Sequence, residues 1–419
     1  MKTIGITNDP ALRSAIFWQQ QLDDGDKVIL QSQEIKQFNQ QIVKESAVMQ
    51  DLKKYPMTQE AAMITQLLNS NGTILAENFY HQGLLVTDEF KKSLLDKCNF
   101  NVLHGIQKLK YGVTVRRANL RILPTNDALY SSAEDTEFDN LQETAIDPAE
   151  PVILLHQSLD NDFYFIQTYN AYGWVAAKDI AIIKERITWL RYIKPEWFFV
   201  VIDKNFRFTI QSEEVLYQMG SKILIKCIAN DQVKVVVPTR KANGDLEEVV
   251  VAIPASESLH KGYLLYTRNH LIAQCFRFLD EPYGWGGLHN SVDCSSLVNA
   301  VYRSVGIDLP RNSGQQERAA GIHYTMHALT RKERYQCISE LQPGDTLHMN
   351  GHVMIYLGEV NHTPYVLHSL GSYTEHFADG SHEKVPVMQV VVSDLILKRY
   401  NGMTFIDDLT TAVSFRSRT

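Results

Sequence analysis

Helical spacing of apolar residues marks the first hundred residues of the chain. Between residues 32 and 52, apolar side chains recur at three- and four-residue intervals, which places them on one face of a helix. These side chains are Ile35, Phe38, Ile42 and Val43. Gln, Lys, Leu and Ile are frequent in this region, and glycine is scarce. The pattern therefore predicts a helical N-terminal region over residues 1–108.

From about Val113, the pattern changes to short apolar runs separated by turn residues, as in a small all-β barrel. These runs cover residues 113–122, 151–156, 162–168 and 173–175. A second set covers residues 198–202, 222–229, 232–238 and 247–253. The Asn243-Gly244 pair between the last two runs is a hairpin signal. The pattern predicts two small β barrels in tandem, over residues 109–188 and 189–258.

A third change of pattern, near residue 262, starts a region in which helices precede strands. Apolar residues at helical spacing predict one helix around residues 271–279 and a second around residues 297–305. Asp293 is suited to cap the start of the second helix, and Gly306 is suited to end it. Cys294 would then be the first helical residue.

Alternating apolar positions follow the Pro343-Gly344-Asp345 loop. They are Val353, Ile355 and Leu357, and then Tyr365 and Leu367. Alternation of this kind predicts two strands of an antiparallel hairpin. Residues 259–419 are therefore expected to form an α+β domain, and the fold class predicted for the whole chain is multidomain α+β.

Composition and charge narrow the class of protein. The chain has 419 residues, enough for two to four domains, and its 44% hydrophobic and 21% charged residues are typical of a globular protein. A net charge of -7 without a long basic run argues against a nucleic-acid partner. The sequence shows neither a secretory signal nor a long apolar run, so we expect no membrane span. A full-length chain would be cytoplasmic, whereas a chain trimmed of a signal would be periplasmic or secreted.

The cysteines are widely separated and form no CxxC pair, which argues against a zinc ribbon or a disulfide framework. Four of them are expected to be structural thiols: Cys98, Cys227, Cys275 and Cys337. Cys294 is different because a thiol in the first turn of a helix lies at the positive end of the helix dipole. This position favours the thiolate and a nucleophilic role.

Two histidines downstream are candidate partners for this thiol. His352 precedes a predicted strand and is the candidate base. A third polar group would hold its imidazole in the productive tautomer. A hairpin that turns at residue 360 places His368 opposite His352, with Cβ atoms about 4.5 to 5.5 Å apart. A bulge would shift this register and leave the role to Ser369 or His348.

Two other interpretations use the same residues. A cysteine in a helix is often only a small buried apolar side chain. Cys294, His352 and His368 would also suit a zinc ion, although the closely spaced ligand pair of structural zinc sites is missing from the sequence. A helix start that follows a glycine-rich loop and precedes two histidines favours the nucleophile, and we expect no metal or cofactor.

Five motifs resemble, in order and spacing, the signature of the NlpC/P60 cell-wall peptidases. They are Tyr283-Gly-Trp-Gly-Gly287, Asp293-Cys-Ser-Ser-Leu-Val298, Leu309-Pro-Arg-Asn-Ser313, Pro343-Gly-Asp345 and His352-Val-Met-Ile-Tyr-Leu-Gly358. Two upstream segments resemble bacterial SH3 (SH3b) modules: Val115 to Thr125 with Tyr172-Gly-Trp-Val175, and Met219-Gly220 with Val237 to Gly244. The N-terminus is similar to the stabilising segment of the NlpC/P60 subgroup that acts on murein peptides. The resemblance implies two SH3-like barrels and a C-terminal papain-like peptidase domain.

The resemblance implies hydrolysis of the γ-D-glutamyl bond to a diamino acid, meso-diaminopimelate or Lys, in murein tripeptides or tetrapeptides. Cys294 would attack the carbonyl, with His352 as base and His368 as orienting group. The hydroxyl of Tyr283 and the backbone N–H of Cys294 would stabilise the oxyanion.

The resemblance also implies a requirement for a free N-terminal L-Ala. Asp293 and Ser295 match positions that contact its amine, and Ser313 matches another substrate-lining position. Tyr130 and Glu134, in the long loop of the first barrel, are candidates for further substrate contacts.

The expected role is turnover or recycling of murein peptides. One alternative is a cell-wall binding protein in which the SH3b modules target murein and catalysis is weak. Another is a papain-like acyltransferase.

The turn from Gly358 to Pro364 is longer than in the family and delays the second histidine. This departure bears on the assignment of His368 but not on those of Cys294 and His352.

Overall fold

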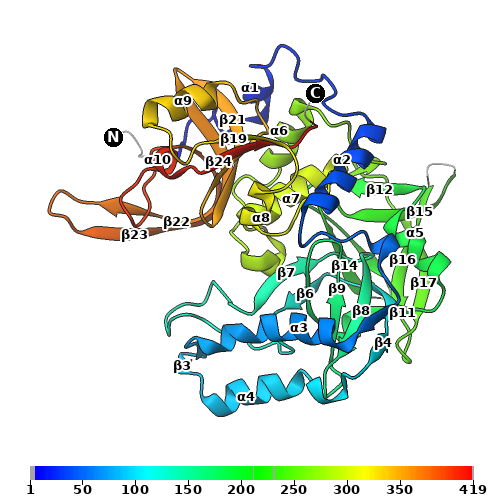
Figure 1. Ribbon diagram of the computed structural model, residues 1–419. Coiled ribbons are helices and arrows are strands. Elements are labelled where there is room, and N and C mark those ends of the chain that lie inside the picture. Colours follow the sequence, from blue (N-terminus) through cyan, green and yellow to red (C-terminus); the bar gives the residue numbers. More distant parts are fainter. Residues whose placement is uncertain (1–4, 211, 230–231, 418–419) are drawn as a thin grey trace.

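The computed structural model describes residues 5–210, 212–229 and 232–417 (Figure 1). It shows a helical N-terminal part, two β-rich parts and a C-terminal part of helices and sheet. The multidomain α+β class predicted from the sequence is confirmed. None of the helices within the described ranges is long and apolar enough to cross a membrane.

The N-terminal part consists of short helices and two small β ladders. Its helices are α1 (Ala15–Gln19), α2 (Ser32–Glu45), α3 (Ala61–Gly72) and α4 (Asp88–Lys97), with 3-10 turns η1 (Leu52–Lys54), η2 (Thr73–Ala76) and η3 (Phe100–Val102). The ladders pair β1 (Thr58–Glu60) with β4 (Ile106–Lys108), and β2 (Tyr80–His81) with β3 (Leu84–Leu85). Helix α2 ends well before the predicted residue 52. The chain becomes extended at Ser46, whose hydroxyl accepts hydrogen bonds from the N–H groups of Val48 and Met49 at 3.2 and 3.3 Å.

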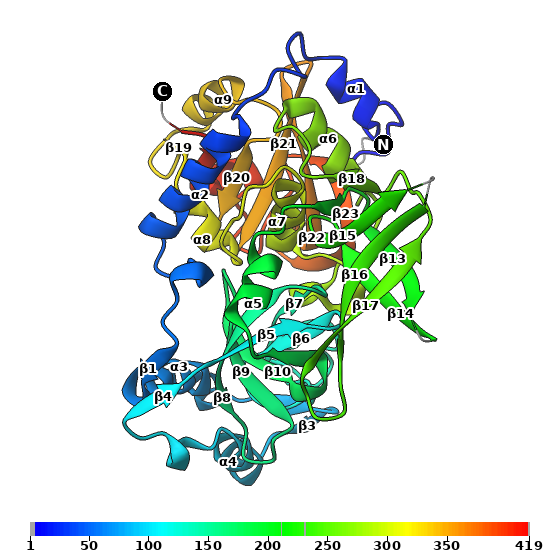
Figure 2. The same ribbon diagram turned by 90° about the vertical axis from the view of Figure 1, so that its right-hand side faces the viewer.

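The N-terminal part divides its apolar side chains between two cores. Leu12, Trp18, Phe38 and Ile42 are buried together with apolar residues of the C-terminal part. Ile64, Leu68, Phe79 and Leu94 are buried together with the strands of the first β part. In Figure 2, α2 accordingly lies beside the C-terminal part, and α3 lies beside the first β part. The N-terminal segment therefore connects the first β part with the last part of the chain.

The first β part is a seven-stranded antiparallel sheet with the order β11-β5-β8-β9-β10-β6-β7. The strands are β5 (Lys110–Thr114), β6 (Ala118–Arg121), β7 (Gln142–Ile146), β8 (Pro151–Gln157), β9 (Phe163–Gln167), β10 (Tyr172–Ala176) and β11 (Ile180–Ile183), with the turn η4 (Ala177–Asp179) before β11. The apolar run at residues 113–122 was predicted as one segment and forms two strands. β5 pairs with β8 and β11, whereas β6 pairs with β7 and β10.

The second β part follows helix α5 (Arg186–Ile193) and has a five-stranded sheet with the order β17-β16-β15-β12-β18. These strands are β12 (Phe198–Val201), β15 (Lys222–Ala229), β16 (Gln232–Arg240), β17 (Leu246–Ile253) and β18 (Leu259–Lys261). A separate hairpin pairs β13 (Asn205–Ile210) with β14 (Glu213–Gln218). The hairpin predicted at Asn243-Gly244 is present, and Gly244 has a φ of 89°, which a residue with a side chain rarely adopts.

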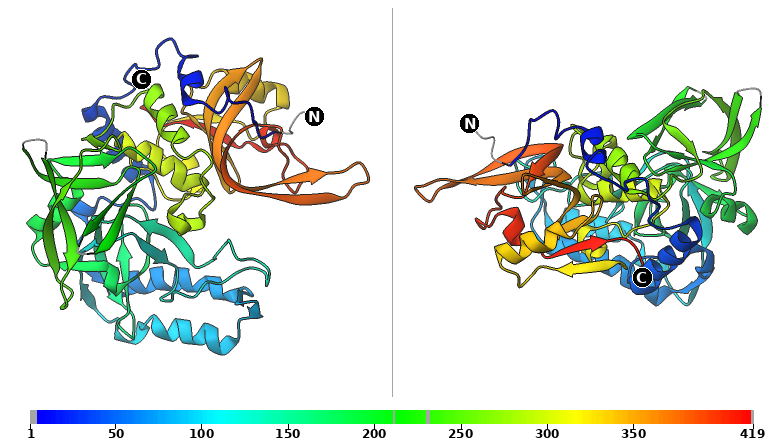
Figure 3. Two further views of the ribbon diagram at one scale, coloured as in Figure 1. Left: turned by 180° about the vertical axis from the view of Figure 1, so that it is seen from behind. Right: turned by 90° about the horizontal axis from the view of Figure 1, so that it is seen from above.

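The C-terminal part places helices before and against a six-stranded sheet. The helices are α6 (Arg268–Phe276), α7 (Cys294–Ser304), α8 (Ser313–Glu317), α9 (Arg331–Ser339) and α10 (Phe405–Asp408), with the turn η5 (Trp285–Asn290) before α7. The sheet has the order β19-β24-β20-β21-β22-β23. Its strands are β19 (Ile322–Thr325), β20 (Thr346–Met349), β21 (His352–Val360), β22 (Thr363–His376), β23 (His382–Asp394) and β24 (Thr411–Ser414). The far end of the β22–β23 hairpin projects from the body of the molecule in both views of Figure 3.

Candidate active site

The thiol of Cys294 lies at the start of α7, as the sequence predicts. Asp293 is the N-cap residue, and its carboxylate accepts a hydrogen bond from the N–H of Ser296 at 2.8 Å. The Cys294 side chain is buried, and the backbone N–H groups of Val353 and Ser295 interact with the thiol. Val353 directly follows His352 at the start of β21, so the thiol contacts the backbone next to the predicted base.

The two predicted histidines are hydrogen-bonded to each other, with His352 Nε2 and His368 Nδ1 2.8 Å apart. On its other side, His368 Nε2 lies 3.0 Å from the hydroxyl oxygen of Ser393. That hydroxyl donates to the backbone carbonyl of Asp394 at 2.9 Å. A serine has one proton to donate, so Ser393 accepts from His368 Nε2, and His368 Nδ1 accepts from His352 Nε2. This direction leaves Nδ1 of His352 with a free lone pair.

The predicted strand register is wrong, although the predicted contact is present. Ile355 pairs with Leu367 and Tyr356 with Val366, and a bulge then shifts the pairing so that Gly358 faces Tyr365. His368 is therefore not directly opposite His352, and the two imidazoles meet diagonally. The longer turn thus leaves the contact of His368 intact. Of the alternatives, Ser369 donates to the carbonyl of Val292, and His348 bonds to the hydroxyl of Thr346.

The ionisation of the pair differs from the expectation of a thiolate. Burial raises the pKa of Cys294 to about 12, and the charge of Asp293 acts in the same direction. Burial lowers the pKa of His352, and the charge of Arg399 adds to this effect. Burial also holds the pKa of His368 well below its ordinary value. Desolvation therefore outweighs the helix dipole and favours the neutral thiol and the neutral imidazoles.

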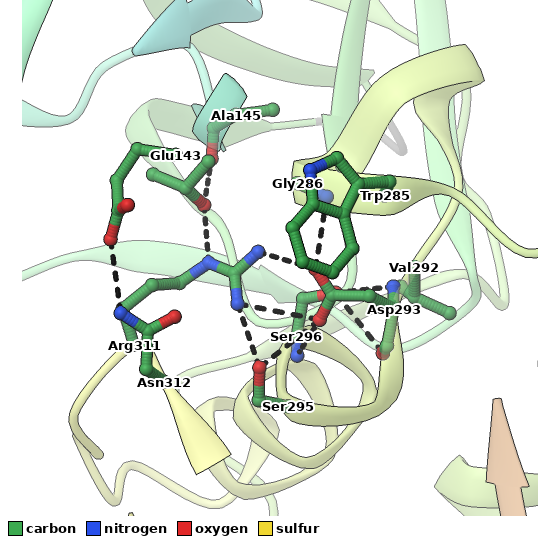
Figure 4. A network of polar contacts seen from close by, with 12 residues as sticks. Glu143, Ala145, Trp285, Gly286, Val292, Asp293, Ser295, Ser296, Arg311 and Asn312 are labelled. Carbon is green, nitrogen blue, oxygen red and sulfur yellow. Dashed lines mark hydrogen bonds and ion pairs between the residues drawn. The ribbon is translucent and has the colours of Figure 1, made fainter. Parts of the chain in front are cut away.

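A buried Arg311, which sequence analysis did not single out, forms an ion pair with Asp293, the acid next to the nucleophile (Figure 4). Its two terminal nitrogens donate to the two oxygens of Asp293 at 3.3 and 2.6 Å. Asp293 also accepts from the hydroxyl of Ser295 at 3.1 Å and the N–H of Gly286 at 3.0 Å. The hydroxyl of Ser295 accepts from Arg311 at 2.8 Å. Asp293 and Ser295, the predicted amine contacts, are thus bonded to each other and to Arg311. A buried carboxylate requires such a counter-charge, which is the signal that could have identified Arg311.

Tyr283 lies next to the nucleophile, and an aromatic contact supports it from outside the C-terminal part. Burial raises the pKa of its phenol, and the charge of Asp293 acts in the same direction, so the hydroxyl keeps its proton and can donate a hydrogen bond. Phe138, from the loop of the first β part, packs against Tyr283 and Trp285 with ring centroids 5.8 and 5.5 Å away. Trp285 donates to the carbonyl of Asp139 at 2.9 Å, which agrees with its expected structural role.

The remaining predicted residues lie at the edges of this arrangement. Ser313 begins α8, and its backbone bonds to His348. Tyr130 exchanges backbone hydrogen bonds with Tyr80 at 2.8 and 2.9 Å, which ties its loop to the N-terminal part. Glu134 is exposed, and within the described ranges no ion pair involves it. The contacts of the described residues do not join Tyr130 or Glu134 to Cys294.

The cysteines of the described chain are free, and the described residues contain no group of three or more His, Cys, Asp and Glu side chains arranged to hold a metal ion. The thiols of Cys98 and Cys275 donate to helix carbonyls of Leu94 and Ile272. Cys294, His352 and His368 do not form such a group.

Family comparisons agree with this geometry. Residues 280–384 match the NlpC/P60 family, and residues 128–176 match the SH3 domain of SH3b1 type. The chain therefore contains an NlpC/P60 domain in its C-terminal part and an SH3b domain in its first β part. The first β part contains this SH3b match, whereas the identity of the second β part as an SH3b domain stays a prediction.

Solved structures and a relative show how far the NlpC/P60 similarity extends. An NlpC/P60 endopeptidase from Photobacterium damselae subsp. piscicida has a TM-score of 0.77 and 19% identity, and the match covers 98% of each chain. An NlpC/P60 family protein from Bacillus cereus has a TM-score of 0.47 and 17% identity, over 73% of this chain and 100% of that one. Dipeptidyl-peptidase 6 from Lysinibacillus sphaericus is 24% identical over 234 residues, which cover 53% of this chain and 78% of the relative. The first of these matches supports the same fold over nearly the whole chain.

Proposed function

We propose that this NlpC/P60 protein cleaves the γ-D-glutamyl bond to the diamino acid of peptidoglycan stem peptides and releases L-Ala-D-Glu. The observation that carries the catalytic assignment is the hydrogen-bond chain from His352 through His368 to Ser393. Its direction leaves Nδ1 of His352 unprotonated, which is the state that a general base requires.

In the proposed reaction, His352 Nδ1 takes the proton of Cys294 as the sulfur attacks the γ-carbonyl carbon of D-Glu. The tetrahedral intermediate collapses when the same imidazole returns the proton to the leaving amine of the diamino acid. Water, deprotonated by His352, then hydrolyses the thioester and frees Cys294. Because the resting thiol is neutral, proton transfer accompanies attack instead of preceding it.

The oxyanion of this intermediate would accept hydrogen bonds from the phenol of Tyr283 and the N–H of Cys294. The raised pKa of Tyr283 supports this role because the phenol remains a donor at every physiological pH. A preorganised donor in a buried site commonly contributes about 3 kcal/mol to transition-state stabilisation.

Release of a dipeptide from a free N-terminus agrees with the name of the Lysinibacillus relative, a dipeptidyl-peptidase. Asp293 already accepts hydrogen bonds from five protein donors. A carboxylate has about four lone-pair sites, so it offers little capacity for a substrate ammonium. We therefore assign the amine contact first to the exposed Glu134 of the SH3b domain, with Tyr130 of the same loop, and treat Asp293 as the cap of α7 that Arg311 holds in place.

Purified protein incubated with L-Ala-γ-D-Glu-diaminopimelate, its N-acetylated form and intact sacculi tests the proposal, with products followed by mass spectrometry. We expect L-Ala-D-Glu from the free peptide alone. Cys294→Ala should abolish the product, and Cys275→Ala, at a buried thiol outside the site, should retain it. Equal cleavage of the acetylated peptide or of sacculi would refute the free-amine requirement.

Failure to cleave any substrate, combined with binding to sacculi, would favour the cell-wall binding alternative. Appearance of an acyl-transfer product with an added amine would favour the acyltransferase. The recycling role and the cytoplasmic location remain predictions, and fractionation of cells together with sequencing of the mature N-terminus tests them.

A further inference from the structure

Strand β7 of the SH3b domain contacts the peptidase domain through three consecutive side chains. The side-chain amide of Gln142 donates to the carbonyl of Gly286 at 2.9 Å. Glu143 accepts from the side chain of Asn312 at 3.1 Å. The hydroxyl of Thr144 accepts from Nε of Arg311 at 2.6 Å. The strand is therefore joined to the loops on both sides of the nucleophile.

Thr144 completes the set of hydrogen bonds around the guanidinium of Arg311. Both residues are buried, and the other guanidinium nitrogens are bonded to Asp293 and Ser295 of the peptidase domain. Thr144 supplies the hydrogen bond to Nε from the SH3b side, so the planar guanidinium is held in one orientation by both domains. Without the hydroxyl, Nε would be a buried donor lacking a partner, which favours movement of the whole group.

Movement of Arg311 would affect the nucleophile through Asp293. The carboxylate of Asp293 caps α7 immediately before Cys294. Its charge disfavours ionisation of the thiol, whereas the charge of Arg311 favours it. The closeness of the guanidinium to the carboxylate therefore decides how much of the negative charge the thiol experiences.

Gln142 acts on the other side of the same carboxylate. Its amide holds the carbonyl of Gly286, while the N–H of Gly286 donates to Asp293 at 3.0 Å. Gly286 has a φ of 55°, and a Cβ at this position would lie 2.5 Å from Cγ of Gln142. This glycine is thus fixed between β7 and the N-cap of α7, in the loop that carries Tyr283.

We infer that Thr144 and Gln142 of the SH3b domain are positioning residues for the catalytic cysteine, acting through Arg311, Gly286 and Asp293. The SH3b domain is on this view a structural part of the active site, in addition to any contact with substrate. The inference rests on the proposed role of Cys294 as nucleophile, and it is independent of which peptide is cleaved.

The test compares Thr144→Val, which replaces the hydroxyl by a methyl group, with Thr144→Ser, which keeps the hydroxyl. Alkylation of Cys294 by iodoacetamide is measured against pH without substrate, and kcat and KM are measured with the tripeptide. We expect T144V to alkylate about threefold more slowly at fixed pH and to lose about tenfold in kcat at nearly constant KM, since small misplacements of a nucleophile carry costs of this order. T144S should recover both values.

Thr114→Val is the matched control. Thr114 is a buried threonine of the same domain, and its hydroxyl bonds to the carbonyl of Asp147 at 2.6 Å. It should lower stability and leave the alkylation profile unchanged. If T144V shows the wild-type alkylation profile, or if T114V shifts the profile equally, the inference is wrong.

Two further outcomes are covered by the same design. If T144V does not fold, Thr144→Ala removes the hydroxyl without filling its space and is judged by the same criteria. If the wild type does not cleave the tripeptide, the proposed substrate is refuted. The alkylation comparison would still decide the role of Thr144.

Discussion

His352 and His368 share a hydrogen bond of 2.8 Å although they are not paired across the two strands that carry them. The bulge between Tyr356 and Gly358 offsets the strands, so each imidazole reaches its partner diagonally. Diagonal neighbours on one face of a sheet remain within reach of long side chains. His368 is completely buried, and the contact therefore fixes the plane and the tautomer of His352 together.

Replacing His368 should test the need for an acceptor at this position. His368→Gln keeps an oxygen that can accept from His352 Nε2, whereas His368→Leu does not. We expect kcat to fall about 100-fold or more in H368L, since loss of tautomer control is costly in related triads, and to fall less in H368Q. Steady-state kinetics with the tripeptide measure both. Equal losses would show that an acceptor alone does not replace the imidazole.

Ser393 is expected to contribute through the tautomer of His368. Ser393→Ala removes the acceptor for His368 Nε2 and allows the reversed direction of the chain, which protonates His352 Nδ1. We expect a decrease in kcat of about tenfold with little change in KM. Ser304→Ala is the control because Ser304 is equally buried and its hydroxyl bonds within its own helix at 2.6 Å. A comparable loss in S304A would contradict this role.

The alkylation rate of Cys294 should report the raised pKa of its thiol. Because that pKa is about 12, the thiolate fraction grows about tenfold for each pH unit between pH 7 and 10. The rate with iodoacetamide should therefore rise steadily over this range. Cys294→Ala gives the background from the other cysteines. A plateau near neutral pH would instead reveal a preformed thiolate and imidazolium pair.

Acid should destabilise the fold through its buried histidines. Replacement of His348 measures the contribution of one of them. Burial lowers the pKa of His348 from 6.5 to about 3. The unfolded chain therefore binds this proton below pH 6.5, while the folded chain does not bind it until about pH 3, so stability falls as the pH decreases between these values. Between pH 6 and 4, the free energy of unfolding of the wild type should fall by about 1.4 kcal/mol per pH unit more than that of His348→Gln. Urea unfolding at several pH values measures the difference, and parallel curves would contradict it.

The sequence predicted the elements that carry the chemistry because their signals are local. A cap at Asp293, helical spacing after Cys294 and alternation after His352 each depend on a few neighbouring residues. The contact between His352 and His368 was also predicted, but the register of the two strands that carry them was predicted wrongly. The bulge that sets the register depends on how β22 packs against both of its neighbours, which is a tertiary property.

The residues that sequence analysis missed act over long separations in the chain. Arg311 meets Thr144 across 167 positions, and Ser393 meets His368 across 25. The raised pKa of Cys294 was missed for the same reason, because desolvation by the surrounding domains is invisible in a local pattern. The domain boundaries at residues 108, 188 and 258 remain predictions.

The division of the N-terminal segment between two cores has a consequence for synthesis of the chain. Trp18 and Phe38 are buried against residues of the last part to leave the ribosome. At about 5 to 20 residues per second, this segment must wait for tens of seconds before its partner exists. The β parts can fold in the meantime, but the amphipathic α2 stays without its packing surface. We therefore expect the final step of folding to join the two ends of the polypeptide, and the early segment to be the region most in need of chaperone protection.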